Sequence, residues 1–398
     1  MLPIRDRRER VVGYALSTFA ANEQVDTDAV DTLARHTVGM VGRLSRLAGR
    51  TLLVPVTPTL VRDGTLTRVA SSDVVWLLAT SALEDATTRR SVDRLVGSGF
   101  HFALEGFPDG APLPPSLVGA TMVLDALQTP PPLLASRIRL VLEAGLRPCV
   151  VAVDDRATRR LALNAGADFV AGRLLTRSAA LATDRELEDT VLRAINILGA
   201  FSDGRPPDST FDTLVGDDPH LAASLLRDLS SATYGMRVPR SISHAMTLLG
   251  RDAVIGRTVL LTARLIGDAA HDAELAFSAL RRARLCERIG GALEGTLHPR
   301  ACAVAGLLSV LEFAVGVPPA MVLERLTLPS SLSDVLVHRA QPLGELLNVV
   351  DAVEFAWWAD VRARCARLGV APQLVTDEWL AAWRAARDEL GTPRSGQA

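Results

Sequence analysis

Four carboxylate side chains occur where predicted strands end, namely Glu105, Asp125, Asp154 and Asp155. If those strands close into a barrel, their carboxyl ends meet at one mouth, which is where barrel enzymes place their catalytic groups. Three or four carboxylates at such a mouth are oxygen ligands suited to one hard cation. A local role is the alternative, because Asp125 and Asp154 stand where the chain leaves a strand, and an acid there caps the following helix.

A histidine–aspartate pair in the second half of the chain, His271-Asp272, points to a different chemistry. Phosphohydrolases of the HD type bind metal through such a pair, together with a further His upstream and an Asp downstream. Candidates for these two roles are His220, His244, Asp334 and Asp351. Asp272 also stands at a predicted helix start, where capping is a sufficient explanation for it.

Lysine is absent from the chain, and all 43 basic residues are arginines. Schiff-base chemistry, a P-loop lysine and a lysine general base are therefore excluded, since arginine stays protonated. The four cysteines form no C-x-x-C pair, so neither a zinc ribbon nor a redox motif is indicated. We expect buried thiols in a reducing compartment at Cys149, Cys286, Cys302 and Cys365. The sequence predicts no bound metal and no cofactor.

The 398 residues carry 43 basic and 45 acidic side chains, a formal net charge of −2, and 48% hydrophobic residues. This length predicts two or three domains with sizeable cores, and the near-zero charge does not favour nucleic acid as a partner. The longest apolar stretch, Ala301–Leu311, is too short to cross a bilayer, and the Arg-rich start Met1–Arg10 precedes no signal-peptide core. We therefore expect a soluble cytoplasmic protein without membrane insertion.

Short β-rich runs alternate with helical segments in the first half, which is typical of an α/β sheet or a (β/α) barrel. The predicted strands are Arg10–Ser17, Thr51–Val56, Asp73–Ala79, Phe100–Glu105, Ala120–Asp125, Pro148–Val153 and Asp168–Gly172. The predicted helices between them are 28–46, 84–98, 133–144 and 157–165, where apolar residues recur three and four apart. Seven strands leave a TIM-like barrel of eight incomplete, so closure needs a further strand.

The second half is predicted to be all-helical, and we place the domains at 1–183 and 184–398. Asp218-Pro219, Ser241 and Asp272 are expected helix starts, because each offers a side-chain oxygen to the first turn. Gly250 suits the left-handed position that ends the second of these helices.

Two groups of side chains on the predicted helices allow an expectation about their surroundings. Arg281, Arg282, Arg284 and Arg288 are expected to face mostly outward, as a solvated surface or, alternatively, a nucleic-acid surface. Trp379 and Trp383 fall on one helical face and predict a packing seam.

Motifs in both halves resemble proteins that join an EAL domain to an HDOD domain. In the first half, the similar stretches are Pro3–Asp6, Val11–Leu16, Gly99–Phe107, Met122–Asp125 and Gly166–Gly172. In the second half, Asp218–Arg227 resembles the HDOD pattern D-P-x-L-A-x-x-L-L-R, and Ser241–Gly250 resembles S-I-x-x-A-I-x-x-L-G. The order and spacing agree over nearly the whole chain, and the HDOD motifs are the more specific ones.

This resemblance implies a TIM-like barrel followed by an all-helical HDOD domain with an HD-like fold. EAL barrels hydrolyse cyclic di-GMP with two divalent metals, which requires oxygen ligands and groups that orient the phosphate. The corresponding positions here hold Ala15, Pro55, Leu77, Val123, Ala152 and Ala171, and Phe19 replaces the arginine that contacts phosphate. We expect these apolar residues to pack the former pocket as core.

The resemblance and these replacements together predict a catalytically inactive EAL domain. The chain would be a non-catalytic regulatory or scaffold protein in bacterial signalling related to cyclic di-GMP. Its partners would be signalling proteins or a second copy of the chain, as a homo-oligomer. One alternative is a receptor that binds cyclic di-GMP or a related nucleotide without hydrolysis, favoured by an open pocket lined by Arg173 and Arg177. The other alternative is a metal-dependent HD-type phosphohydrolase that uses His271 and Asp272.

Overall fold

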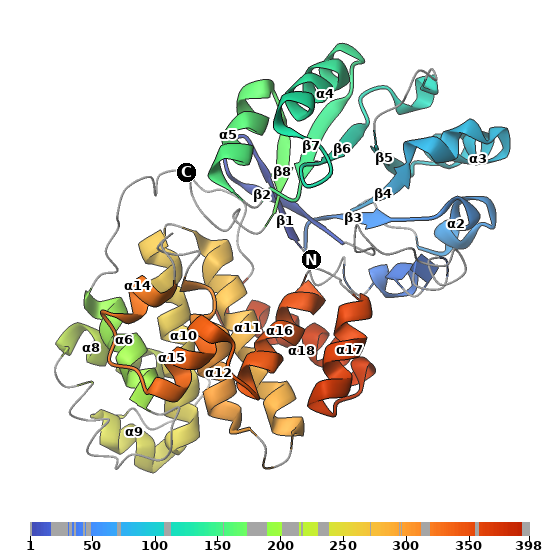
Figure 1. The fold of residues 1–398 in the computed structure, drawn as a ribbon. Helices are drawn as coiled ribbons and strands as arrows, with labels where there is room; N and C mark the ends of the chain where they lie inside the picture. The colour runs from blue at the N-terminus through green and yellow to red at the C-terminus, as the bar shows by residue number, and fades with distance from the viewer. Residues whose placement is uncertain are drawn as a thin grey trace. The chain divides into compact units, whose positions relative to one another are not determined.

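The computed structural model divides the chain into two compact units (Figure 1). The first consists mainly of residues up to Leu175, and the second mainly of residues from Thr176 on. The domain boundary expected between residues 183 and 184 lies outside the described residues and stays a prediction. The structure describes residues 2–16, 31, 34–35, 37–42, 44, 49–69, 73–106, 113–153, 155–172, 189–200, 215, 218–229, 239–270, 272–293, 295, 297–311, 319–354 and 358–391.

The first unit is built around a closed barrel of eight strands that neighbour one another in chain order (Figure 1). The strands are β1 (Leu2–Asp6), β2 (Val11–Ala15), β3 (Thr51–Pro55), β4 (Val74–Ala79), β5 (His101–Glu105), β6 (Thr121–Asp125), β7 (Arg147–Val151) and β8 (Phe169–Ala171). Neighbours from β2 to β8 are parallel, whereas β1 is antiparallel to both β2 and β8. The TIM-like barrel is therefore confirmed, and it is complete.

Strand β1 is the missing eighth strand, and it lies in the Arg-rich start of the chain. Its residues include Pro3 and two charged side chains, so the alternation that marks a strand is weak. Arg5 is nevertheless only 5% exposed, and its Nη1 donates to the main-chain oxygen of Glu9 at 2.8 Å. This hydrogen bond ties the β1–β2 hairpin together and gives the buried guanidinium an acceptor.

The barrel strands form continuous apolar runs because both of their faces are buried. In β3, the side chains of Leu52, Leu53 and Val54 are 0%, 5% and 0% exposed. The helices of this unit are α2 (Pro58–Arg62), α3 (Ala86–Gly97), α4 (Pro131–Glu143) and α5 (Arg156–Ala165), with 3₁₀ turns η1 (Thr65–Arg68), η2 (Thr80–Glu84) and η3 (Pro115–Leu117). The described residues between 31 and 44 are also helical, within the predicted helix 28–46.

The second unit is helical throughout its described residues, as predicted. Its helices are α6 (Asp189–Ala200), α8 (Pro219–Leu229), α9 (Ile242–Leu249), α10 (Arg251–Ala270), α11 (Ala273–Ala292), α12 (Pro299–Leu308), α14 (Pro319–Leu323), α15 (Ser330–His338), α16 (Leu343–Glu354), α17 (Trp358–Leu368) and α18 (Pro372–Leu390). No helix in the described parts of either unit is both long enough and apolar enough to cross a membrane.

All three predicted helix starts in this unit are confirmed. Asp218 Oδ1 accepts from the main-chain N–H of Leu221 at 3.0 Å, and Ser241 Oγ accepts from that of His244 at 3.1 Å. Asp272 Oδ1 accepts from the N–H of Glu274 at 3.0 Å. Gly250 differs from the expectation, because its φ of 84° comes with a ψ of 152° and not with the left-handed helical ψ. Such an extended turn still requires glycine.

Helix α11 packs against α10, α12 and α18 and forms the centre of the second unit (Figure 1). Its predicted apolar face is buried, with Leu280, Ala283, Cys286 and Ile289 all 0% exposed. The tryptophan seam is also confirmed, because Trp379 and Trp383 of α18 are buried and their rings meet edge to face at 6.2 Å between centroids. Phe277 of α11 meets Trp383 in the same manner at 4.8 Å.

The four cysteines are free and buried, as the sequence predicts. Burial raises the pKa of Cys149 and of Cys302 to about 12. Because the thiolate is the reactive form, these side chains act as small core residues.

Gly13 in β2 gives a test of barrel packing. A Cβ at this position would lie 2.5 Å from the main-chain oxygen of Thr51 in the paired strand β3. We expect Gly13→Ala to lower the free energy of unfolding by about 1–3 kcal/mol, because the backbone of β3 must move. Urea unfolding followed by circular dichroism measures this loss.

Gly97 at the end of α3 is the matched control, since a Cβ there meets no atom within 4 Å. We expect Gly97→Ala to change stability by less than about 1 kcal/mol, in the stabilising direction, because alanine favours the helix. Equal unfolding midpoints for the two variants would contradict the close β2–β3 approach.

Candidate functional site

The mouth at the carboxyl ends of the strands is apolar where the resemblance places catalytic residues, metal ligands among them. The six positions, at or within two residues of the ends of β2, β3, β4, β6, β7 and β8, are Ala15, Pro55, Leu77, Val123, Ala152 and Ala171. All are buried except Ala152, which is partly exposed. Their side chains carry no oxygen or nitrogen, so these positions supply none of the ligands that a divalent cation requires.

The backbone after β7 adopts an uncommon conformation at this mouth. Ala152 has a φ of 57°, a left-handed value that costs a non-glycine residue about 1–3 kcal/mol. The N–H of Val153 then donates to the main-chain oxygen of Ala171 at 3.1 Å, and a Cβ on Gly172 would lie 2.2 Å from the oxygen of Val153. The ends of β7 and β8 are therefore in backbone contact, which leaves no room for a side chain at Gly172.

Glu105 and Asp125 are the two acids that the structure places together, at the ends of the adjacent strands β5 and β6. Desolvation and the negative charge of Asp125 both raise the pKa of Glu105. Because Glu105 keeps a large exposed fraction, we expect only a modest rise. Asp125 Oδ1 accepts from the N–H of Leu127 at 2.8 Å, so this carboxylate closes a turn, and Pro130 occupies the N-cap of α4.

Asp155 has a structural role as the N-cap of α5. Its Oδ1 accepts from the N–H of Thr158 at 2.8 Å, and hydrogen bonds from the Thr158 hydroxyl and backbone lower its pKa. Asp154 lies outside the described residues, as do Phe19, Arg173 and Arg177. Across the described ranges, no three side chains among His, Cys, Asp and Glu are grouped so that they would hold a metal.

Three of the residues proposed for HD-type chemistry, Asp272, His244 and Asp351, have other contacts. Asp272 is 5% exposed and caps α11, whereas His271 lies outside the described residues. His244 Nδ1 accepts from the main-chain N–H of Arg240 at 3.1 Å. Asp351 pairs with two arginines, and the carboxylates of the described residues form no further metal-like group with it.

The arginines of α11 are buried or ion-paired, contrary to the expectation that they face outward. Arg281 and Arg282 are 5% and 4% exposed, and only Arg288 of the four has a largely exposed side chain, at 45%. Arg281 lies over the ring of Trp383, 4.9 Å from its centroid, in a cation–π contact. The expected outward face fails because Arg281 stacks on an aromatic ring, whereas Arg282, Arg284 and Arg288 reach acids on other helices.

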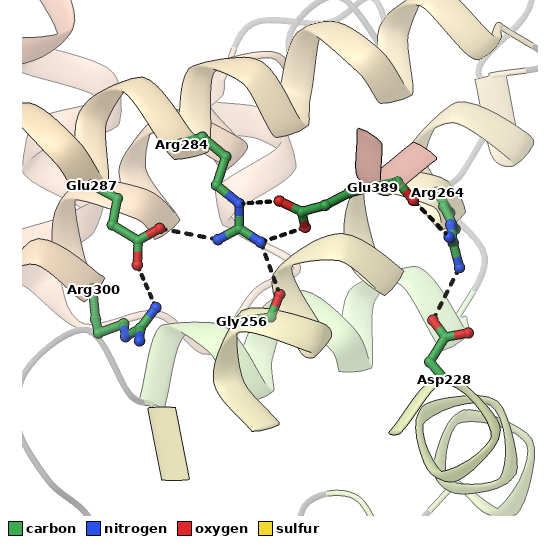
Figure 2. A network of polar contacts seen from close by, with 7 residues as sticks. All are labelled: Asp228, Gly256, Arg264, Arg284, Glu287, Arg300 and Glu389. Atoms are coloured by element: carbon green, nitrogen blue, oxygen red, sulfur yellow. Dashed lines mark hydrogen bonds and ion pairs between the residues drawn. The ribbon is translucent and has the colours of Figure 1, made fainter. Parts of the chain in front are cut away.

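Arg284 of α11 uses all three of its guanidinium nitrogens in hydrogen bonds to acids (Figure 2). Its Nε and Nη2 bind the two carboxylate oxygens of Glu389 in α18 at 2.9 and 2.7 Å, and its Nη1 binds Glu287 at 3.0 Å. Burial alone would lower the pKa of Arg284, but the hydrogen bonds and charges of Glu389 and Glu287 raise it. A guanidinium held in this way has no free edge for a nucleic-acid phosphate.

The same network joins helices that are distant in sequence (Figure 2). Arg300 of α12 pairs with the second oxygen of Glu287. Arg264 of α10 binds Asp228 of α8 at 3.0 Å and the main-chain oxygen of Glu389 at 3.2 Å. Sequence patterns miss these pairs, since Arg284 and Glu389 are 105 residues apart.

Arg284 and Arg288 allow a matched test of the network, because both reach from α11 to acids of α18. We expect Arg284→Met to lower the free energy of unfolding by about 2–3 kcal/mol, since Glu389 then loses its bidentate partner in a largely buried site. We expect Arg288→Met to cost less than about 1 kcal/mol, because that pair is more exposed. Urea unfolding of both variants measures these two free energies. Similar losses of stability in the two variants would contradict the role given to Arg284.

The raised pKa of Glu105 predicts a pH-dependent contribution to stability. The folded state holds this proton more tightly than the unfolded state, so the contribution is present at low pH and is lost as the pH rises above 4.5. We expect Glu105→Gln to be more stable than the parent at neutral pH, with the difference vanishing well below pH 4.5. Thermal unfolding across the pH range measures the difference.

Asp155→Asn is the control, because we expect its effect on stability to depend on pH in the opposite direction. The pKa of Asp155 is lowered in the folded state, so its contribution is present above 3.8 and is lost as the pH falls. The variant should therefore be less stable than the parent at neutral pH. The same pH trend in both variants would contradict the two environments described above.

Comparisons with known proteins assign part of the helical unit. The family model for the HDOD domain matches residues 192–312, which confirms the HDOD resemblance and includes α11 and α12. A cyclic di-GMP phosphodiesterase of Vibrio cholerae, CdgJ, is 29% identical over 180 residues, covering 44% of this chain and 41% of CdgJ. The chain thus matches less than half the length of that relative.

Solved structures, among them EAL domains, are similar to part of the chain. The EAL domain of Mycobacterium smegmatis DcpA is 21% identical, with 44% of this chain and 89% of that one covered and a TM-score of 0.34. Klebsiella pneumoniae BlrP1 is 13% identical, with 44% and 55% covered and a TM-score of 0.33. This chain joins a closed eight-stranded barrel to an HDOD domain, in the order that its resemblance to EAL–HDOD proteins predicts.

Proposed function

We propose that this chain is a non-catalytic regulatory protein related to cyclic di-GMP signalling, which acts through contacts with other proteins. The observation that carries the proposal is the apolar barrel mouth. Ala15, Leu77, Val123 and Ala171 are 9%, 7%, 1% and 0% exposed at positions where the resemblance implies ligands for metal or phosphate. These buried apolar side chains fill the barrel mouth and form part of its hydrophobic core.

The charge at the mouth also supports this proposal. Two divalent metals need several anionic oxygen ligands, and a metal-activated water must be held in line with the phosphate. Glu105 and Asp125 are two carboxylates whose mutual repulsion contributes to the raised pKa of Glu105. Asp155 is occupied as a helix cap. Within the described part of the barrel mouth, two available carboxylates are a poor match for a two-metal site.

The link to signalling comes from the HDOD match and from CdgJ, which is named as a cyclic di-GMP phosphodiesterase. The similarity to CdgJ covers 44% of this chain. It supports a place in cyclic di-GMP signalling more strongly than it supports phosphodiesterase activity. We therefore propose recognition by protein surfaces as the role of this chain. The partners would be signalling proteins or a second copy of the chain.

Titration of the full chain with cyclic di-GMP tests this proposal. We expect no heat beyond dilution at up to about 1 mM ligand with Mg²⁺ or Mn²⁺ present, which corresponds to binding weaker than about −4 kcal/mol. Chromatography of the incubated mixture should show no hydrolysis product. An active EAL phosphodiesterase in the same buffer is the positive control.

The other outcomes distinguish the alternatives. Heat without product would make the chain a nucleotide receptor and would overturn the claim that the mouth is closed to ligand. Product formation that requires metal would overturn the non-catalytic proposal altogether. Glu105→Gln should abolish such turnover if the barrel is responsible and leave it unchanged if the helical unit is.

A further inference from the structure

The large apolar side chains that the protein exposes are gathered around α4. Among the described residues, five of the six lie between positions 118 and 142, on α4 or in the connections on either side of β6. They are Val118, Leu127, Leu133, Leu140 and Leu142. Exposed apolar side chains that gather in one place mark a contact surface more often than scattered ones do.

Helix α4 directs its exposed leucines to two opposite sides. The side that faces the barrel is buried and consists of Leu134, Ile138 and Val141. Leu142 lies on the side toward α5, because a Cβ on Gly166 at the end of α5 would be 2.7 Å from the Cδ1 of Leu142. With 3.6 residues per turn, Leu133 and Leu140 share the other side of the helix, about half a turn away from Leu142.

This other side of α4 faces the connection from β5 to β6. Helices α2, α3, α4 and α5 follow β3, β4, β6 and β7, whereas the described residues between β5 and β6 form no α-helix and only the 3₁₀ turn η3. Helices that follow neighbouring barrel strands pack side by side, as α4 and α5 do (Figure 1). Within the described residues, α4 therefore has a close helical neighbour on the side of Leu142 and none on the side of Leu133 and Leu140.

The charge around this side of α4 is positive. Helices α3 and α4, which border the β5–β6 connection, hold five arginines and two acids, although the whole chain has a net charge of −2. Arg137 stands one turn from both exposed leucines, and its Nη1 donates to the hydroxyl of Thr129 at 3.4 Å. Arg90 of α3 is exposed and donates to the main-chain oxygen of Ala86 at 3.2 Å. These acceptors are neutral, so they do not cancel the positive charge.

We propose that the side of α4 with Leu133 and Leu140 binds an acidic amphipathic helix of a partner protein. Leucines seven residues apart form a ridge that a second helix can pack against, and a helix there would restore the side-by-side packing of the outer layer. Acidic side chains on that helix would complement the arginines of α3 and α4. The inference rests on the proposed function, because it specifies the class of protein that the chain contacts.

The test uses a fluorescent peptide of about 20 residues, with leucines three and four apart on one helical face and glutamates on the other. One control peptide has lysines in place of the glutamates, and another has the same composition without helical periodicity. Fluorescence anisotropy with the full chain measures the affinities. We expect a Kd below about 100 μM for the acidic peptide and binding at least about tenfold weaker for both controls. A rise in salt from about 50 to about 500 mM should weaken the acidic peptide about tenfold, because exposed charges are screened.

Leu140→Gln and Leu142→Gln form a matched pair, since these leucines are 46% and 41% exposed on opposite sides of α4. We expect Leu140→Gln to weaken binding of the acidic peptide at least about tenfold and Leu142→Gln to leave it unchanged within about twofold. Leu133→Gln should repeat the loss seen with Leu140→Gln. Arg137→Gln should weaken binding about threefold and reduce its dependence on salt. Thermal unfolding by circular dichroism verifies that each variant is folded.

Several results would overturn the proposal. Equal binding of the acidic and lysine peptides would do so, as would equal losses in Leu140→Gln and Leu142→Gln. A dimer of the parent that dissociates in Leu140→Gln would assign this side of α4 to a second copy of the chain. Binding to phosphatidylglycerol vesicles that Leu140→Gln abolishes would assign it to a membrane surface. Hydrolysis of cyclic di-GMP would overturn the proposed function without changing peptide binding, so the two failures are distinguishable.

Discussion

Arg284 must have anionic partners, because a guanidinium that is 14% exposed loses most of its hydration when the helical unit folds. Those partners come from two directions, with Glu287 from the same helix and Glu389 from α18. Glu389 lies beyond residues 192–312, the extent of the HDOD match. The tryptophan seam of α18 packs on the same helix. In physical terms, the helical unit is therefore complete only when α18 is included.

The helical unit and the barrel mouth handle charge in opposite ways. The helical unit buries arginines and neutralises them with acids from distant helices, which ties α8, α10, α11, α12 and α18 together. The barrel mouth instead carries apolar side chains where the resemblance implies polar or charged ones, and its described residues keep one pair of neighbouring acids, Glu105 and Asp125. Apolar replacement avoids the cost of unpaired buried charge. A left-handed Ala152 at the end of β7 shows that backbone strain persists at this mouth in spite of that replacement.

Local signals in the sequence predict local structure well here. The caps at Asp218, Ser241 and Asp272 and the seam of Trp379 and Trp383 follow from short-range chemistry, and the structure confirms them. Strand β1 escapes prediction because its pairing with β8 is set by barrel closure and not by its own alternation. The burial of Arg281 and Arg282 escapes prediction because polar residues on a helix are assigned outward until a distant partner is known.

Asp351 extends the same use of distant acids to another side of the helical unit. It lies on α16 and joins Arg282 of α11 to Arg339 of α15. Arg282 is only 4% exposed, and its Nη2 meets Asp351 Oδ1 at 2.6 Å although the two residues are 69 positions apart. Its Nε donates to Ser309 Oγ at 2.7 Å, so this buried guanidinium has partners on two further segments. A buried arginine is tolerated because such partners replace the water that it loses on folding, and removal of one partner would leave an uncompensated charge. The packing of α11 against its neighbours and the placement of these acids therefore depend on each other.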